Sequence, residues 1–159
     1  MNERGLAIAM MYHEDGQYPE ADNRPALNEL QWIQYQLDQY ASVEEVVNNL
    51  DHIRLEKSMY ELHYTVSDAS GHTVIIEFIA GKPQVIKDAQ YFTVTNTSFD
   101  KSLQYANKFK GTSISKLSKR VNSLDRFTLA YRIVENKSLQ YVSSQIPIKE
   151  AFTVLEEVS

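Results

Sequence analysis

The chain has 159 residues, of which 43% are hydrophobic and 23% are charged, and its formal net charge is -5. This length and composition exclude a wholly disordered chain and predict a single folded domain over residues 1–159. The acidic balance argues against a nucleic-acid partner, and the short basic cluster of Lys116, Lys119 and Arg120 is better explained as a solvated helix face.

The chain contains no cysteine, which excludes disulfides, thiolate zinc sites and cysteine nucleophiles within these residues. No apolar run approaches the about 20 residues that a membrane-spanning helix needs, so no membrane contact is expected. The apolar stretch after Arg4 soon meets His13, Glu14 and Asp15, which is unlike a signal peptide. We therefore expect a cytoplasmic protein.

The first elements in chain order are a strand, a loop and a helix. Residues 5–12 are continuously apolar, which suits a strand buried on both faces, although the pattern does not separate it from a short helix. Residues 14–25 are polar and predict a loop. Pro25 suits the first turn of a helix whose apolar residues recur at steps of three and four. These residues are Leu30, Ile33, Leu37 and Tyr40.

A second helix is predicted where Ser42 and Glu45 form the S-x-x-E pattern of a capping box. Its apolar stripe comprises Val43, Val46, Val47 and Leu50. Because β-branched residues are weak helix formers, packing against other elements must hold this helix.

The apolar period then changes from helical to alternating. Leu62, Tyr64 and Val66 alternate with polar residues, which predicts a half-buried strand. Turns at residues 68–71 and 80–83 bound a second strand at 73–79 and a third at 84–87, and a fourth is expected at 91–95. Short loops between such strands predict an antiparallel meander.

After Asn96 the helical period returns and continues to the end of the chain. Successive helices are expected around four groups of apolar residues. The groups are Tyr105 and Phe109; Ile114, Leu117 and Val121; Leu124, Phe127 and Tyr131; and, behind Pro147, Ile148, Phe152 and Leu155. Helices segregated from an antiparallel sheet indicate an α+β fold, built in layers.

Few residues suggest chemistry by spacing alone. The four histidines, His13, His52, His63 and His72, show no metal-ligand spacing, so we expect no metal and no cofactor. His63 is expected to be hydrogen-bonded or solvent-facing. Glu14 and Asp15 are explained more simply as a solvated turn than as paired catalytic acids. No Gly-rich phosphate loop and no G-x-S-x-G elbow occurs.

Several stretches nevertheless resemble one family, and together they cover nearly the whole chain. The first, NERGLAIA at residues 2–9, is similar to the "NE(K/H)GLA(I/V)A" strand of the choloylglycine hydrolases. These linear amide C–N hydrolases include penicillin V acylases and conjugated bile salt hydrolases. The resemblance continues through ASVEEVVNNL in the helix pair 32–50, IEF at 76–78, VTN at 94–96 and SLDRF at 123–127.

The resemblance implies an N-terminal-nucleophile fold, an αββα sandwich of which this chain would be an incomplete portion. In the family a cysteine that follows the initiator Met attacks the amide, and its own α-amine handles the proton. Asn96 stands at the position that stabilises the oxyanion, and Arg126 at the position beside the nucleophile. Tyr12 stands at a position that lines the oxyanion region, where acylases tend to carry Tyr and bile salt hydrolases Asn.

Each of these residues also has a simpler explanation from the sequence. Asn is a favoured helix cap, so Asn96 could cap the helix that follows it. Arg126 could be a surface helix residue, and Tyr12 could be an aromatic side chain of the core.

The family's Met-Cys start is absent, as are the segment expected before residue 1 and the closing strands expected after residue 159. We therefore expect a truncated or split hydrolase of small-molecule amides that is inactive alone. The alternative is a non-catalytic module that binds acyl ligands or a partner, and an unrelated α+β domain is a third possibility. A sheet that lacks strands exposes an edge, which predicts self-association or a partner chain that completes the sheet.

Overall fold

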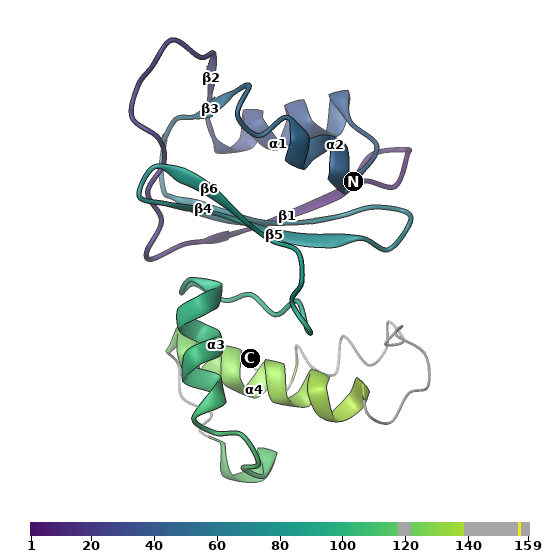
Figure 1. Ribbon diagram of the computed structural model, residues 1–159, viewed down its shortest axis with the longest axis vertical. Coiled ribbons are helices and arrows are strands. Elements are labelled where there is room, and N and C mark those ends of the chain that lie inside the picture. The colour runs from purple at the N-terminus through teal and green to yellow at the C-terminus, as the bar shows by residue number, and fades with distance from the viewer. Residues whose placement is uncertain (118–121, 139–155, 157–159) are drawn as a thin grey trace. The chain divides into compact units, whose positions relative to one another are not determined.

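The computed structural model describes residues 1–117, 122–138 and 156. The chain divides into two compact units, an N-terminal unit, Met1–Phe92, and a C-terminal unit, Thr93–Ser159 (Figure 1). Each unit has its own hydrophobic core, so the single domain expected from the sequence stays a prediction. None of the helices within the described residues is long and apolar enough to cross a membrane.

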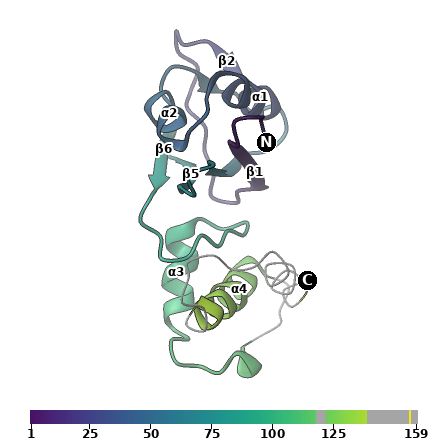
Figure 2. The ribbon, with the colours of Figure 1, turned by 90° about the vertical axis from the view of Figure 1, so that its right-hand side faces the viewer.

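The N-terminal unit is built on a four-stranded antiparallel sheet with the strand order β1-β4-β5-β6. Its strands are β1 (Ala7–Tyr12), β4 (Leu62–Ser67), β5 (Thr73–Ile79) and β6 (Lys82–Ile86). Helices α1 (Glu29–Gln39) and α2 (Val43–Asn48) lie on one face of this sheet (Figure 2). Two short strands, β2 (Ala26–Leu27) and β3 (Arg54–Leu55), pair in parallel outside it. The meander predicted from residues 62–79 is confirmed.

The core of this unit forms where the inward positions of the sheet meet the helices. Trp32 on α1 is fully buried, and its ring centroid lies 4.6 Å from that of Tyr64 on β4. Val46 on α2 and Ile76 on β5 are fully buried in the same cluster. The predicted alternation on β4 and the apolar stripe on α2 therefore correspond to the faces that meet in this core.

Both helices begin at reciprocal capping boxes. On α2 the predicted pair, Ser42 and Glu45, is confirmed. On α1 the box uses Asn28 and Gln31, so the helix begins at Glu29 and not at Pro25 as expected. Pro25 lies just before β2, where its carbonyl accepts a hydrogen bond from the backbone of the β3 segment.

The residues at the start of the chain have local structural roles. Asn2 Nδ2 donates hydrogen bonds of 2.8 Å to the carbonyls of Leu37 and Tyr40, which satisfies the C-terminal end of α1. Gly5 has a positive φ of 87°, and a Cβ there would lie 2.9 Å from the Cβ of Ala69. The packing of the fold therefore requires Asn at position 2 and Gly at position 5 of the NERGLAIA stretch.

The carboxylate of Glu29 joins α1 to the segment before β4. It accepts hydrogen bonds from the Ser58 hydroxyl at 2.6 Å and from the backbone N–H of Ser58 at 2.9 Å and of Met59 at 3.3 Å. Burial of the carboxyl alone raises its pKa, but the hydrogen bonds from Ser58 and Met59 outweigh burial and hold the pKa of Glu29 below its ordinary value.

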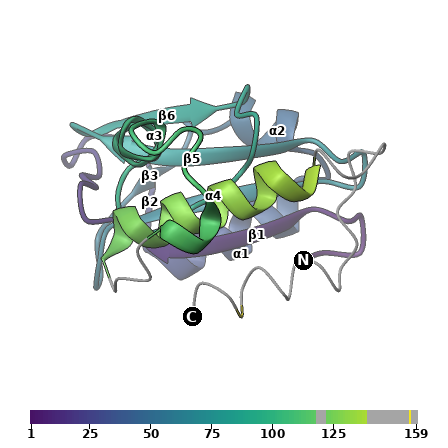
Figure 3. The ribbon, with the colours of Figure 1, turned by 90° about the horizontal axis from the view of Figure 1, so that it is seen from below.

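The C-terminal unit is helical in the part that the structure describes. It contains α3 (Phe99–Asn107), a 3₁₀ turn, η1 (Ile114–Lys116), and α4 (Ser123–Ser138). Figures 1 and 3 show that the axes of α3 and α4 cross steeply. Where they meet, the rings of Phe99 and Phe127 pack edge to face with centroids 5.9 Å apart. An antiparallel sheet in one unit and helices in the other confirm the predicted α+β class.

Several expectations for the strands were wrong. β1 is not buried on both faces, because it is an edge strand that pairs with β4 on one side, and its last four residues are exposed. The third meander strand begins at Lys82, two residues early, because the turn needs only Ala80 and Gly81. No strand forms at 91–95, and the Thr95 side chain is hydrogen-bonded to Ser123 at the start of α4.

Expectations for the last helices need similar correction. The helix expected around Ile114 and Leu117 is only the 3₁₀ turn η1, and its third apolar residue, Val121, lies outside the described residues. α3 ends at Asn107, before Phe109, whose ring still packs on that of Tyr105 at 5.2 Å. The helix expected around residues 148–155 also lies outside the described residues.

Candidate functional site

In the C-terminal unit, Asn96 lies in the turn that leads into α3, and the first residue of α4 fixes the backbone on both sides of it. The Oγ of Ser123 accepts a 2.8 Å hydrogen bond from the backbone N–H of Thr97. The Thr95 hydroxyl donates to the carbonyl of Ser123 at 3.1 Å and lies 2.9 Å from its Oγ. These three residues are buried, so the position of the Asn96 backbone is fixed by hydrogen bonds shielded from water.

Arg126 contacts the side chain of Asn96. It lies three residues after Ser123 on the same face of α4, and its Nη2 donates a 2.7 Å hydrogen bond to Asn96 Oδ1. A guanidinium only donates, so the amide must present its carbonyl end to Arg126 and its Nδ2 end away from it. In this orientation the Nδ2 group of Asn96 can donate hydrogen bonds to a developing oxyanion.

The simpler explanation for Asn96 is wrong, whereas Arg126 is a partly exposed residue of α4 that also contacts Asn96. The cap of α3 is Ser98 rather than Asn96. Arg126 is half-buried and hydrogen-bonded rather than fully solvated. Their assignment to catalysis itself stays a prediction, since the geometry is compatible with it but includes no reacting atom.

The N-terminus of α4, which carries Ser123 and Arg126, is held by a network that the sequence reasoning missed. Asn122 Oδ1 accepts from the backbone N–H of Asp125 at 2.8 Å, and Asn122 Nδ2 donates to Asp125 Oδ2 at 2.6 Å. The Tyr105 hydroxyl on α3 donates to Asp125 Oδ1 at 2.9 Å. The N-x-x-D pattern at residues 122–125 is a capping signal that could have predicted this start.

The described residues around Asn96 offer no activated nucleophile. The hydroxyl of Ser123 is buried and already engaged by Thr95 and Thr97. Residues 93–159 contain neither Cys nor His, so this unit has no imidazole that could act as a general base for a serine or threonine hydroxyl. The pair formed by Asn96 and Arg126 can therefore polarise a carbonyl but does not by itself attack one.

Tyr12, the third residue expected at the site, belongs to the N-terminal unit. It ends β1 with 44% of its surface exposed, so it is not a core aromatic. Its ring packs edge to face against that of Tyr60, with centroids 5.7 Å apart. Its assignment to substrate binding stays a prediction.

The N-terminal unit also contains a buried cluster of metal-ligand types, His13, His63 and Glu77. One candidate ligand atom from each lies within 4.8 Å of the other two. His63 is thus buried, and its Nδ1 lies 3.2 Å from Glu77 Oε1. Spacing did not predict this cluster, because its members come from β4, β5 and the residue after β1 and meet only through the register of the sheet.

Comparison with known proteins places the chain in a family. The model of the linear amide C–N hydrolases, choloylglycine hydrolase family, matches residues 1–135. The chain belongs to this family. Among curated relatives, a penicillin V acylase of Pectobacterium atrosepticum is 31% identical to it in a 152-residue alignment that covers 86% of this chain and 40% of the relative. The resemblance seen in the sequence is confirmed.

Solved members of the choloylglycine hydrolase family share the fold. The structure of penicillin V acylase from Agrobacterium tumefaciens matches with a TM-score of 0.82 and 32% identity, over 100% of this chain and 51% of that one. A variant of conjugated bile acid hydrolase from Clostridium perfringens matches with a TM-score of 0.83 at 20% identity, over 100% of this chain and 58% of that one. These matches confirm that the chain forms a portion of the predicted N-terminal-nucleophile fold. The chain spans about half the length of these relatives.

Proposed function

We propose that these 159 residues form the oxyanion-stabilising portion of an amide hydrolase of the penicillin V acylase and bile salt hydrolase type. The observation that carries the proposal is the 2.7 Å hydrogen bond from Arg126 to Asn96, formed at the two positions that the family resemblance assigns to the reaction. In this role Asn96 Nδ2 donates to the oxyanion of the tetrahedral intermediate, and Arg126 holds the amide in the orientation that allows it.

The substrate in this proposal is a small molecule with a linear amide. Tyr12 stands where acylases of the family tend to carry Tyr, which favours an acyl group of the penicillin V type over a bile acid. The exposed ring of Tyr12 supports this reading, because it can pack on an aromatic acyl group without losing a role in the core.

The same residues do not supply the attacking atom. Acyl transfer through a covalent intermediate needs an activated nucleophile, and the family uses a cysteine thiolate, which this sequence lacks. Removing the nucleophile from such a site leaves oxyanion stabilisation and binding but not the covalent route. We therefore expect no turnover from these residues alone and turnover only when further polypeptide supplies the cysteine.

The outer edge of β1 is where we place that further polypeptide, whether it lies on the same chain or on another. β1 is the terminal strand of the sheet, and Met10, Met11 and Tyr12 on it are 40–47% exposed. Relatives about twice as long share this fold, so the proposed occupant is a strand from the part of the family fold that these residues do not cover. Such a strand would add its backbone hydrogen bonds to the edge of β1 that pairs with no other strand in the described part of the chain.

The proposal is tested by supplying the missing part. The chain would be joined to the portion of the Pectobacterium atrosepticum acylase that it does not match, and release of phenoxyacetate from penicillin V measured. Turnover is expected, and Asn96→Ala should lower kcat by about 100-fold or more, as loss of an oxyanion donor does. Asn107→Ala, at the exposed end of α3, is the matched control. Equal activity of the two variants would contradict the role of Asn96.

A second candidate function, a module that binds acyl ligands without hydrolysis, is favoured by the fact that Asn96 and Arg126 pair within this chain. It predicts that phenoxyacetate shifts the side-chain amide signal of Asn96 saturably in nitrogen-correlated NMR spectra. The signal is assigned with Asn96→Asp, and the amide of Asn107 should not move. If phenoxyacetate binds the chain saturably and the fused protein gives no turnover of penicillin V, the binding module is favoured over the hydrolase.

A further inference from the structure

The buried cluster of His13, His63 and Glu77 brings together three elements of the N-terminal unit. His63 on β4 and Glu77 on β5 lie across adjacent strands, continuing the register in which Tyr64 pairs with Ile76. His13 follows directly on β1, and its backbone N–H donates to the carbonyl of Glu61 just before β4. The strand ladder therefore places the three side chains together.

The burial of this cluster is unusual for such polar side chains. His13 and His63 are each 1% exposed and Glu77 is 3% exposed. Within the part of the chain that the structure describes, His63 Nε2 has no hydrogen-bond partner. A buried nitrogen without a partner costs about 1–3 kcal/mol, and a ligand that accepts its lone pair would remove that cost.

We propose that His13, His63 and Glu77 form a binding site for a divalent transition-metal ion of the zinc type. Two imidazoles and one carboxylate are a ligand set that zinc commonly takes, and one candidate ligand atom from each residue lies within 4.8 Å of the other two. Harder cations such as magnesium prefer all-oxygen sites, so the two histidines select against them. The site is independent of the proposed amidase function, because it uses neither Asn96 nor Arg126.

The histidine rings must turn for the ion to bind. They are stacked with centroids 4.6 Å apart and planes 12° apart, whereas an ion lies near the plane of each ring that ligates it. Rotation about the side-chain torsions would bring the ligating nitrogens toward a common point. The backbone of Gly16 leaves room beside the His13 ring, since a Cβ there would lie 3.1 Å from His13 Nδ1.

The role of Glu77 follows from its contact with His63. Its Oε1 lies 3.2 Å from His63 Nδ1, which leaves His63 Nε2 for the ion. In one arrangement the carboxylate orients His63 from behind, as in many carboxylate–histidine–zinc sites. In the other, the carboxylate leaves His63 Nδ1 as the side chains turn and ligates the ion directly. In both, the ion links the end of the edge strand β1 to the two central strands β4 and β5.

The test is a titration of the full chain, freed of metal by a chelator, with Zn²⁺ in a calorimeter and with Co²⁺ in an absorption spectrometer. One equivalent of each ion is expected to bind, and Co²⁺ should give the intense visible bands of a four-coordinate site. His63→Gln should weaken Zn²⁺ binding by at least about 10-fold, and Glu77→Gln by about 10- to 100-fold. Zn²⁺ should also raise the melting temperature of the unsubstituted chain.

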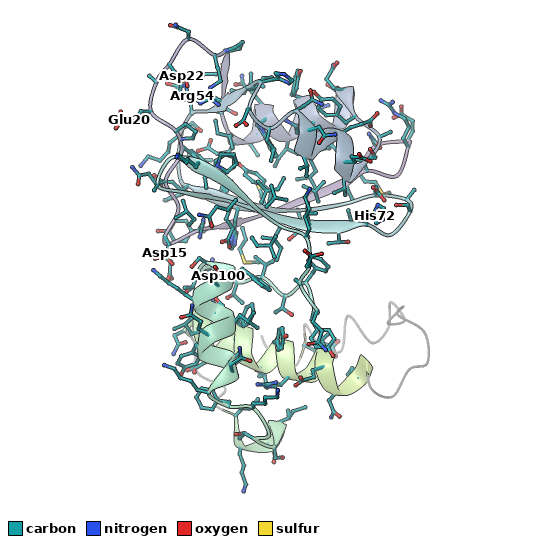
Figure 4. The ribbon with its side chains drawn as sticks, viewed as in Figure 1. Asp15, Glu20, Asp22, Arg54, His72 and Asp100 are labelled. Atoms are coloured by element: carbon teal, nitrogen blue, oxygen red, sulfur yellow. The ribbon has the colours of Figure 1, made fainter. Side chains whose placement is uncertain are left out.

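Two exposed histidines of the same unit provide the controls. His72 lies at the turn between β4 and β5 (Figure 4), and His52 follows α2. His72→Gln and His52→Gln should bind Zn²⁺ like the unsubstituted chain. Absence of stoichiometric binding, unchanged binding in His63→Gln, or equal loss in His72→Gln would overturn the proposal. If His63→Gln does not fold, as judged by circular dichroism, the melting temperature of the unsubstituted chain decides. A melting temperature that does not change when Zn²⁺ is added would overturn the proposal.

Discussion

Ser123 accepts a 2.8 Å hydrogen bond from the backbone N–H of Thr97, and this contact joins the first residue of α4 to the turn that carries Asn96. Both residues are buried, so the Thr97 N–H has no solvent to replace the hydroxyl if it is removed. The stability of the C-terminal unit and the position of Asn96 therefore depend on the same hydroxyl.

Ser123→Ala should lower the free energy of unfolding by about 1–3 kcal/mol, because it leaves a buried backbone N–H without its acceptor. The measurement is urea denaturation followed by circular dichroism. Ser113→Ala is the matched control, since Ser113 is exposed and its hydroxyl lies 3.0 Å from that of Ser115. That variant should stay within about 0.5 kcal/mol of the unsubstituted chain. Equal effects in the two variants would contradict the role given to Ser123.

Trp32→Ala should cost about 3–5 kcal/mol of unfolding free energy, because it empties the centre of the N-terminal core where the indole packs on Tyr64. Leu30→Ala, also on α1 but 55% exposed, should change stability by less than about 0.5 kcal/mol. Thermal and urea unfolding followed by circular dichroism measure both. A comparable loss in the two variants would place the core elsewhere.

The hydrogen bonds that hold the pKa of Glu29 below its ordinary value predict a pH dependence of stability. For a carboxyl whose folded pKa is lowered, the stabilisation is complete above the unfolded pKa, about 4.3 for Glu, and is lost as the pH falls through the folded pKa. Glu29→Gln should therefore destabilise the chain at neutral pH, and the difference from the unsubstituted chain should shrink in acid.

Urea denaturation at about pH 7 and in steps down to about pH 3 measures this difference. Glu3→Gln is the control, because Glu3 is exposed. A difference between Glu29→Gln and the unsubstituted chain that stays constant over the whole range would show that the carboxylate charge is not what stabilises the contact with Ser58.

Within the described residues no strand pairs with the outer edge of β1, and this predicts that the chain associates with itself when no other strand occupies that edge. Light scattering after gel filtration should detect oligomers at high protein concentration. Met11→Lys places a charge on the edge strand, which disfavours strand pairing between molecules, and should shift the population toward monomer. Met59→Lys, which is exposed but outside any strand, should not. A monomer at all concentrations in the unsubstituted chain would argue against an open pairing edge.

The sequence predicted those parts of the fold that depend on local patterns. The alternation of Leu62, Tyr64 and Val66 identified β4, because the side-chain period of a strand is fixed by its geometry. The capping box of Ser42 and Glu45 identified the start of α2, because both partners lie within one helical turn and form a local sequence pattern. The family resemblance named Asn96 and Arg126 as site positions, but the hydrogen bond between them was not predicted.

Features that depend on tertiary register were not predicted. His13 and His63 are fifty residues apart and stack only because Met11 pairs with His63 in the ladder of β1 and β4. The exposure of β1 could not be read from its apolar composition, because burial depends on which strands lie beside it. Pro25 was given more weight than the Asn28 and Gln31 pair, although only the pair satisfies the backbone groups at the start of α1.

The central claim is that these residues hold the oxyanion side of an amidase without its nucleophile. It is tested most directly by incubating the purified, mass-verified chain with penicillin V and measuring the release of phenoxyacetate. No release above the buffer rate is expected, either for the unsubstituted chain or for Asn96→Ala. Release by the unsubstituted chain that Asn96→Ala abolishes would contradict it, because a nucleophile other than cysteine would then be present in these residues.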